Sequence, residues 1–374
     1  TVAELADLVK AAGPSPESCD LLLDAAHFAT TEGDRQQALR EAINGRAALG
    51  DRQAAAELCT RFLREYPDAA DAAGVQLQLA RLLAALKRDD EALTTFSLIQ
   101  DNSAAPLELR LQAAREAGAL LLARRRHEEA KARFAFLAEF SPDPGGRGEG
   151  RYWLAETMFR QGLLAESAAA FQELAESGGA WREPALFRAA QAHCQLQDYP
   201  TARTALQDFI ARFSASPLYP DAVFQLARVE QLAGNHETAR AGFTSFAEAF
   251  PEHEYAPRAW FEAGELAFAA GQPAVAVQAY DQLLTRYPGH SLAANTLCRR
   301  IFARDAAGDG AGARADTAKL IQEYPDSPYA IQARYWLADH LREQQDYPAA
   351  EAALREIAAL PDRPDESAHA LFEA

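Results

Sequence analysis

Side chains that could carry out chemistry are few in this chain, and their spacing matches none of the familiar catalytic patterns. His127 is followed by Glu128 and Glu129, but no second histidine completes the two-histidine face of a zinc-binding helix. No serine-hydrolase elbow, zinc-protease pair or phosphate-binding glycine loop occurs in the sequence. We therefore expect a protein that is not an enzyme and that holds no metal and no cofactor.

Weaker candidates have a structural explanation beside the chemical one. His253 and His290 are 37 residues apart and could face each other as a metal pair, or they could be solvated turn residues. Glu262 and Glu265 lie three residues apart, which fits an ion-paired helix face as well as an acid–base pair. The basic run 124–126 could contact an anion or an acidic partner, or it could be a hydrated turn.

Composition narrows the class of partner. The 374 residues carry 37 basic and 54 acidic side chains, a net charge of −17, which disfavours nucleic acid and anionic lipid as partners. No apolar run reaches the roughly 18 residues of a membrane-spanning helix. The four cysteines form no closely spaced pair, so we expect buried thiols rather than a disulfide framework.

A repeat of about 37 residues organises most of the chain. The reference column holds small residues at Ala55, Ala92, Ala130, Ser167, Ala202, Ala239, Ala276, Ala313 and Ala350. A second column, twelve residues earlier, is mostly Ala or Gly: Ile43, Ala80, Gly118, Ala155, Ala190, Ala227, Gly264, Ile301 and Ala338. A third, four residues after the reference, is mostly aromatic: Cys59, Phe96, Phe134, Phe171, Leu206, Phe243, Tyr280, Thr317 and Leu354.

These offsets predict two helices per repeat. Positions 0, +4 and +7 share one helix stripe, and two small columns let two helices cross closely. A turn with glycine at Gly234, Gly271 and Gly308 separates the two helices, and a Tyr-Pro or Phe-Pro pair closes the unit. No single pair buries its apolar face, so the pairs must stack. The sequence therefore predicts an all-α, right-handed solenoid of about nine helix hairpins with period 37.

The pattern of small, small, aromatic and proline positions resembles the tetratricopeptide repeat, in a longer-period variant. The stretch Glu323 to Ala330, followed by Tyr335-Trp336-Leu337-Ala338 and Asp346-Tyr347-Pro348, is similar to repeats of bacterial outer-membrane-assembly lipoproteins and of periplasmic Tol–Pal-associated repeat proteins. The resemblance covers about residues 35–374. It implies a scaffold protein in which the first helix of each pair lines the ligand-binding side.

The repeat pattern also divides the chain. We expect residues 1–33 to form N-terminal capping helices over 2–11 and 16–31, residues 34–140 to hold repeats 1–3, and residues 151–364 to hold repeats 4–9. The proline- and glycine-rich residues 141–150 suggest an irregular joint between two arrays. Residues 365–374 read as the start of a tenth repeat, which suggests a segment of a longer protein.

One stripe of the first helices could bind a partner. Its aromatic and basic members are Tyr152, Phe159, Phe187, Phe224, Arg228, Phe261, Phe268, Phe302 and Tyr335. By the resemblance they would line a concave groove for an extended peptide or a partner helix. An aromatic stripe at helical spacing also fits core packing between neighbouring pairs, and that alternative stays open.

The resulting functional prediction is a non-catalytic protein–protein interaction scaffold, in a bacterial periplasm or cell envelope by resemblance, with the cytoplasm as the alternative location. A self-associating repeat array and the scaffold part of a larger enzyme are the alternative functions. The partner is expected to be a protein or peptide, with no nucleic acid and no direct membrane span. The oligomeric state is left open.

Overall fold

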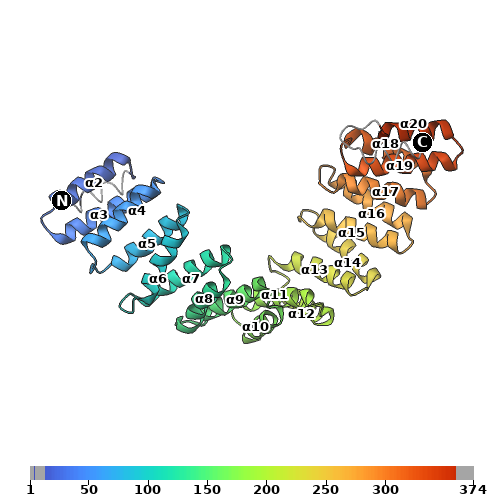
Figure 1. The fold of residues 1–374 in the computed structure, drawn as a ribbon. Coiled ribbons are helices and arrows are strands. Elements are labelled where there is room, and N and C mark those ends of the chain that lie inside the picture. Colours follow the sequence, from blue (N-terminus) through green and yellow to red (C-terminus); the bar gives the residue numbers. More distant parts are fainter. Residues whose placement is uncertain (1–3, 5–12, 359–374) are drawn as a thin grey trace. The chain divides into compact units, whose positions relative to one another are not determined.

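The computed structural model describes residue 4 and residues 13–358, and this part of the chain folds into helices without strands (Figure 1). It contains nineteen helices. In chain order they are α2 (Pro16–Phe28), α3 (Glu32–Ala48), α4 (Arg52–Glu65), α5 (Ala72–Ala85), α6 (Asp89–Asp101), α7 (Leu107–Ala123), α8 (His127–Phe140), α9 (Pro144–Gln161), α10 (Leu164–Ser177), α11 (Arg182–Gln195), α12 (Tyr199–Arg212), α13 (Tyr219–Leu232), α14 (His236–Ala249), α15 (Ala256–Ala269), α16 (Pro273–Arg286), α17 (Ala293–Ala306), α18 (Gly310–Glu323), α19 (Pro328–Glu343) and α20 (Tyr347–Ala358).

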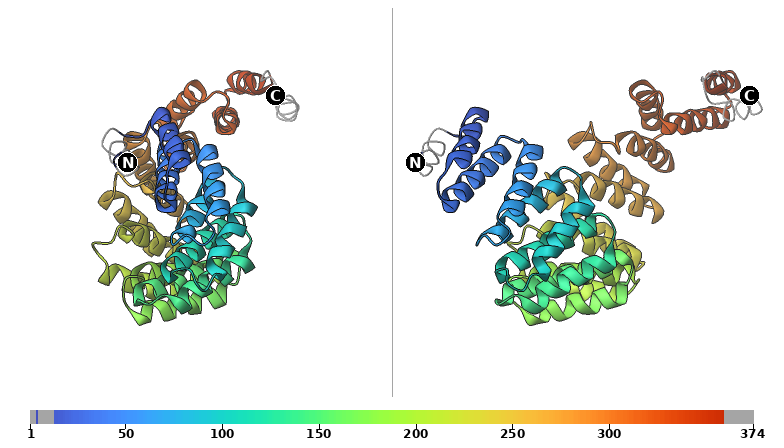
Figure 2. Two further views of the ribbon diagram at one scale, coloured as in Figure 1. Left: turned by 90° about the vertical axis from the view of Figure 1, so that its left-hand side faces the viewer. Right: turned by 60° about the vertical axis from the view of Figure 1, so that its left-hand side comes forward.

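The helices follow the predicted pairing. The odd-numbered helices from α3 to α19 carry the second column, and the even-numbered helices from α4 to α20 carry the reference column. We call the former A helices and the latter B helices. The described residues divide into two compact units, with the boundary between residues 196 and 197. Within each unit every helix packs against the helices before and after it in the chain (Figure 2). Eight of the nine predicted A–B pairs lie within one unit, and the ninth, α11 with α12, is divided between the two units. The prediction of an all-α helical-repeat fold is confirmed.

Small residues on the A helix receive aromatic rings from the B helix of the same pair. A Cβ added at Gly118 would lie 2.6 Å from the ring of Phe134, and one added at Gly264 would lie 2.3 Å from the ring of Tyr280. Both rings are at most 1% exposed. The second and third sequence columns are therefore the two sides of one contact, and burying each ring stabilises its pair by roughly 1.5–3 kcal/mol.

The turn between the two helices of a pair has one backbone form throughout. A single residue with positive φ follows the A helix in all nine pairs, at Gly50, Lys87, Arg125, Gly162, Gln197, Gly234, Gly271, Gly308 and Gln345. This left-handed residue ends the A helix and turns the chain back. Glycine adopts it without steric cost, whereas the four residues with a Cβ do so at a cost of about 1 kcal/mol each.

Two closing Tyr-Pro pairs in the second unit each fasten a repeat to the one before it. The hydroxyl of Tyr287 donates a hydrogen bond to the carbonyl oxygen of Pro251 at 2.7 Å, and that of Tyr324 donates to Pro288 at 3.4 Å. Each tyrosine thus reaches back 36 residues to the preceding closing turn. The closing proline therefore has two roles, because it follows the end of the B helix and its carbonyl oxygen accepts this hydrogen bond.

The prediction of an irregular joint over 141–150 is wrong, because α9 begins at Pro144. Asp143 caps this helix by accepting a hydrogen bond from the amide of Gly146 at 2.8 Å. The glycines permit close packing rather than flexibility. A Cβ at Gly150 would lie 2.3 Å from the backbone nitrogen of Ala138 on α8, and one at Gly148 would lie 2.7 Å from the ring of Trp181.

The remaining predictions about organisation have mixed outcomes. The step of 35 residues after Ser167 has a direct cause, because only residues 178–181 link α10 to α11, whereas residues 213–218 link α12 to α13. The helix predicted over 16–31 is present as α2 and packs against α3. The helix predicted over 2–11 and the start of a tenth repeat at 365–374 lie outside the described residues.

Candidate functional site

Every residue of the predicted stripe is buried or only partly accessible. Phe224 on α13 is 2% exposed, and its ring contacts those of Phe243, Phe246 and Tyr255. Phe187 on α11 is 8% exposed. These two residues belong to the core and do not line a binding surface, because their side of the A helix faces the neighbouring helices. For them the alternative of core packing holds.

The other predicted residues are half-buried. Tyr152 packs its ring against Trp153, Phe171 and Trp181, and burial raises the pKa of its hydroxyl. Phe261 lies against Tyr280 with ring centroids 6.3 Å apart. Phe302 and Tyr335 each border a separate apolar cluster, and Arg228 is half-buried on α13.

Phe159 takes part in a contact between two A helices of the first unit. The guanidinium of Arg188 on α11 lies 4.9 Å from the ring centroid of Phe159 on α9. Arg188 also forms an ion pair with Glu156, one turn before Phe159, and donates to Gln191 at 2.7 Å. Glu156 accepts a second hydrogen bond, from Arg160 at 2.7 Å. Its side chain is 2% exposed, so this buried carboxylate is compensated by two arginines.

Phe268 occupies the same position in the second unit. The guanidinium of Arg299 on α17 lies 5.8 Å from the ring centroid of Phe268 on α15 and donates to Glu265 at 2.7 Å. The hydrogen bond to Glu265 raises the pKa of Arg299. The hydroxyl of Tyr280 also donates to Glu265, and burial together with this bond raises the pKa of that hydroxyl.

The two clusters therefore repeat one arrangement, a glutamate and a phenylalanine on one A helix and an arginine on the next. We call them the Glu156 cluster (Glu156, Phe159, Arg188) and the Glu265 cluster (Glu265, Phe268, Arg299). The arginine side chains are 24% and 37% exposed, respectively. An arginine fixed by a carboxylate and an aromatic ring is preorganised, so it can offer hydrogen bonds and a flat surface to a ligand at little entropic cost.

The arginines of these clusters were missed at the level of the sequence. Arg188 follows Glu156 by 32 residues and Arg299 follows Glu265 by 34, a little less than one repeat. A search for opposite charges at this separation would have found them. It also finds Arg115 with Glu149, whose guanidinium and carboxylate are 2.6 Å apart between α7 and α9.

The weaker chemical candidates have structural roles. The imidazole Nδ1 atoms of His253 and His290 accept hydrogen bonds from the backbone amides of Tyr255 and Leu292, two residues on, at 3.2 and 3.1 Å. Arg124 and Arg126 pair with Asp89 and Asp90 of the preceding pair of helices. The described residues contain no group of three or more histidine, cysteine or carboxylate side chains placed to bind a metal ion.

Burial also determines the chemical state of Cys59 and Cys298. Desolvation raises the pKa of the Cys59 thiol to about 12 and that of Cys298 to about 11. Both side chains are at most 1% exposed. A thiol protonated at neutral pH is a poor nucleophile and metal ligand, so these cysteines serve packing. Among the helices of the described region, none has the length and apolar character needed to cross a bilayer.

Comparison with known proteins supports the repeat class. Residues 180–347 match the family model described as YfiO, outer membrane lipoprotein. No curated protein matches the chain in sequence. The crystal structure of the C-terminal part of a TPR repeat-containing protein from Cytophaga hutchinsonii superposes with a TM-score of 0.55 at 15% identity, covering 68% of this chain and 98% of that one.

A second solved structure has the same fold over more of the chain. The apo form of RapI superposes with a TM-score of 0.53 at 12% identity and covers 90% of this chain and 96% of that one. At these identities the likeness shows the fold alone. Together with the helix order, it shows that the chain has a tetratricopeptide-like helical-repeat fold, and residues 180–347 are similar to the outer membrane lipoprotein family.

Proposed function

We propose that this chain is a non-catalytic scaffold that binds an extended peptide or a helix of a partner protein along its A helices. The observation that carries the proposal is the recurrence of one accessible arginine–phenylalanine–glutamate arrangement, the Glu156 and Glu265 clusters, at the same repeat position in each unit. Arg188 compensates the buried carboxylate of Glu156, but that role alone would not require its guanidinium to remain partly exposed over the ring of Phe159.

The chemistry of the clusters suits a peptide. A guanidinium can donate to carbonyl or carboxylate oxygens of a bound chain, and the aromatic ring beneath it fixes its orientation. Tyr152 and Phe261 add apolar edges beside the clusters. We therefore propose a separate binding surface on each unit. The surface of the first unit consists of the Glu156 cluster with Tyr152, and that of the second consists of the Glu265 cluster with Arg228, Phe261, Phe302 and Tyr335. Neither includes the buried Phe187 and Phe224.

Site-specific photocrosslinking tests this surface. A benzoylphenylalanine placed at Phe159 or Phe268 in the host cell should crosslink to a second protein. The same residue placed at Phe140, an aromatic side chain on the B helix α8 that is 45% exposed, is the matched control. Crosslinks that form equally from Phe140, or that are absent from both A-helix positions, would contradict the proposal.

We further propose that the scaffold acts in a bacterial cell envelope. The support is the match of residues 180–347 to the outer membrane lipoprotein family model. Fractionation of host cells, followed by protease treatment of intact and osmotically shocked cells, tests this location. Protection of the protein in shocked cells, with release only on lysis, would place it in the cytoplasm instead.

A further inference from the structure

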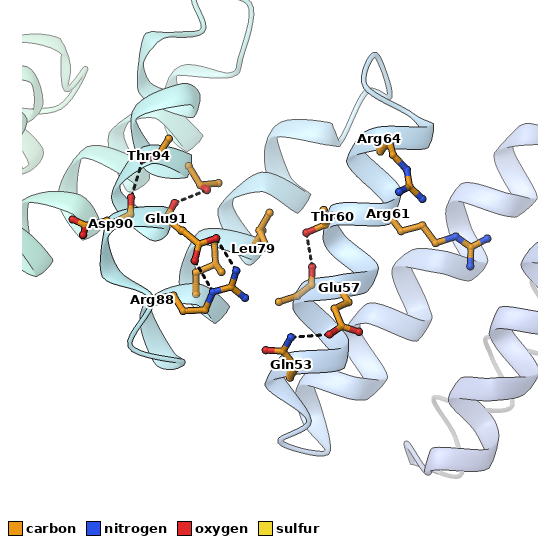
Figure 3. A pocket seen from close by; sticks show the side chains of 13 residues that line it. Gln53, Glu57, Thr60, Arg61, Arg64, Leu79, Arg88, Asp90, Glu91 and Thr94 are labelled. Carbon is orange, nitrogen blue, oxygen red and sulfur yellow. Dashed lines mark hydrogen bonds and ion pairs between the residues drawn. The ribbon is translucent and has the colours of Figure 1, made fainter.

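A groove of about 690 Å³ opens between two neighbouring B helices of the first unit, α4 and α6 (Figure 3). Leu79 and Leu83 of α5, with Ala56 of α4, contribute apolar side chains to it, and all three are less than 10% exposed. Charged and hydroxyl-bearing side chains of α4 and α6 form its walls. The groove lies on B helices, so it is separate from the A-helix surface proposed above.

The next gap between B helices is closed by the chain itself. Between α6 and α8 the cavity is only about 170 Å³. Arg133 of α8 reaches across it and donates hydrogen bonds to Ser97 at 2.8 Å and to Gln100 at 2.7 Å, both on α6. Arg126 adds a contact to Asp90 at 3.0 Å.

Repeat register explains why the first groove stays open. Thr95 precedes Arg133 by 38 residues and holds the equivalent position on α6, so no long side chain crosses from α6 to α4. Thr60 precedes Ser97 by 37 residues and holds the equivalent position on α4. Its hydroxyl donates to the carbonyl of Ala56 at 2.9 Å, which leaves the oxygen able to accept. The first groove keeps the acceptor but has no cation at the position equivalent to Arg133, and its arginines, Arg61, Arg64 and Arg88, line it elsewhere.

A carboxylate lies beside this acceptor. Glu57, three residues before Thr60, accepts a hydrogen bond from Gln53 at 2.7 Å. No salt bridge of 4.0 Å or less joins Glu57 to a cation among the described residues, and it acts on Arg88 across the groove only through its charge. The nearest cation on the opposite wall, Arg88, is held on α6 by Glu91 through contacts of 2.6 and 2.7 Å. One turn beyond Thr60, Arg64 has a side chain that is 77% exposed.

We propose that the groove between α4 and α6 binds an amphipathic helix of a partner protein, whose basic side chain takes the place that Arg133 fills in the next groove. The apolar stripe of the partner would cover Leu79 and Leu83. Its arginine or lysine would reach Glu57 and Thr60, and an acidic residue about one turn away would meet Arg64. The net charge of −17 favours the approach of such a basic segment.

A display selection tests this proposal with a defined probe. A library of 16-residue helix-forming peptides is selected on the complete protein, and the affinities of the enriched peptides are then measured by fluorescence polarisation. We expect peptides with an apolar stripe flanked by a basic residue and an acidic residue one turn apart. Binding to Thr95→Arg, which copies the closed neighbouring groove, should be at least tenfold weaker.

Two further variants make the result decisive. Glu57→Gln should weaken binding at least threefold, more for peptides with the basic residue than for those in which it is replaced by glutamine. Thr204→Arg, an exposed threonine on α12 of the second unit, is the matched control and should bind as the wild type does. Circular dichroism establishes that each variant is folded. Failure to enrich any peptide, equal binding by Thr95→Arg, or a consensus without a basic residue would overturn the proposal.

Discussion

Replacing Gly150 by alanine would place a methyl group against the backbone of α8, at the point where α8 and α9 cross. The added Cβ would lie 2.3 Å from the nitrogen and 2.6 Å from the Cα of Ala138. Neither atom can move by rotation of a side chain. The two helices must separate, and the first unit must rearrange around them.

Two opposing effects set the magnitude. Insertion of an extra methyl group into a well-packed contact costs about 1–3 kcal/mol, and a backbone obstacle puts this site at the upper end, about 3 kcal/mol. Alanine in a helix is more favourable than glycine by about 1 kcal/mol. We therefore expect Gly150→Ala to lower the free energy of unfolding by about 2 kcal/mol.

Urea unfolding followed by circular dichroism measures the change. Gly74→Ala is the matched control, because Gly74 lies in α5 and its added Cβ would meet no atom within 4 Å. That variant should be more stable than the wild type by up to about 1 kcal/mol. If Gly150→Ala were also stabilised, the close packing of α8 against α9 would not require the glycine, and this reasoning would be refuted.

Four further outcomes are expected. Gln345→Gly should stabilise the protein by about 1 kcal/mol in urea unfolding, because the residue has φ of 63°. Tyr287→Phe should cost about 1 kcal/mol in the same assay, through loss of its hydrogen bond to a closing turn. Cys194, which is half-buried, should react with a thiol reagent before Cys59, and a faster reaction of Cys59 would contradict the assigned burial. Burial opposes ionisation of Glu230, but hydrogen bonds from Arg203 and Asn235 outweigh it and lower its pKa, so Glu230→Gln should cost about 2 kcal/mol at pH 7, and this difference should shrink as pH falls below about 4.

The helix pairs could be predicted from sequence because the contact within a pair depends on the sizes of the residues that form it. A small residue on the A helix and a ring on the B helix, as at Gly118 and Phe134, recur at fixed offsets. It was harder to predict which side of each A helix faces the core. An A helix contacts helices on several sides, so a periodic aromatic stripe does not reveal that Phe224 faces the core while Phe159 meets an arginine.

The joint was predicted wrongly because glycine has two uses. The same residue type permits a flexible loop and a close helix crossing, and the run 144–150 is rich in it. Only the position of Ala138 across the contact distinguishes the two. The open groove was missed for a similar reason. Thr95 alone indicates nothing, and only comparison with Arg133, at the equivalent position one repeat later, shows that a bridging side chain is absent.

The hydrogen bonds of Tyr287 and Tyr324 have a consequence for how such an array can change in length. Each bond joins two closing turns that differ by one repeat, and donor and acceptor are both repeat positions. Duplication or removal of a complete 37-residue segment in the second unit would regenerate the bond at the new junction. An insertion of any other length would separate hydroxyl from carbonyl, so gene changes in whole repeats are the ones this architecture tolerates.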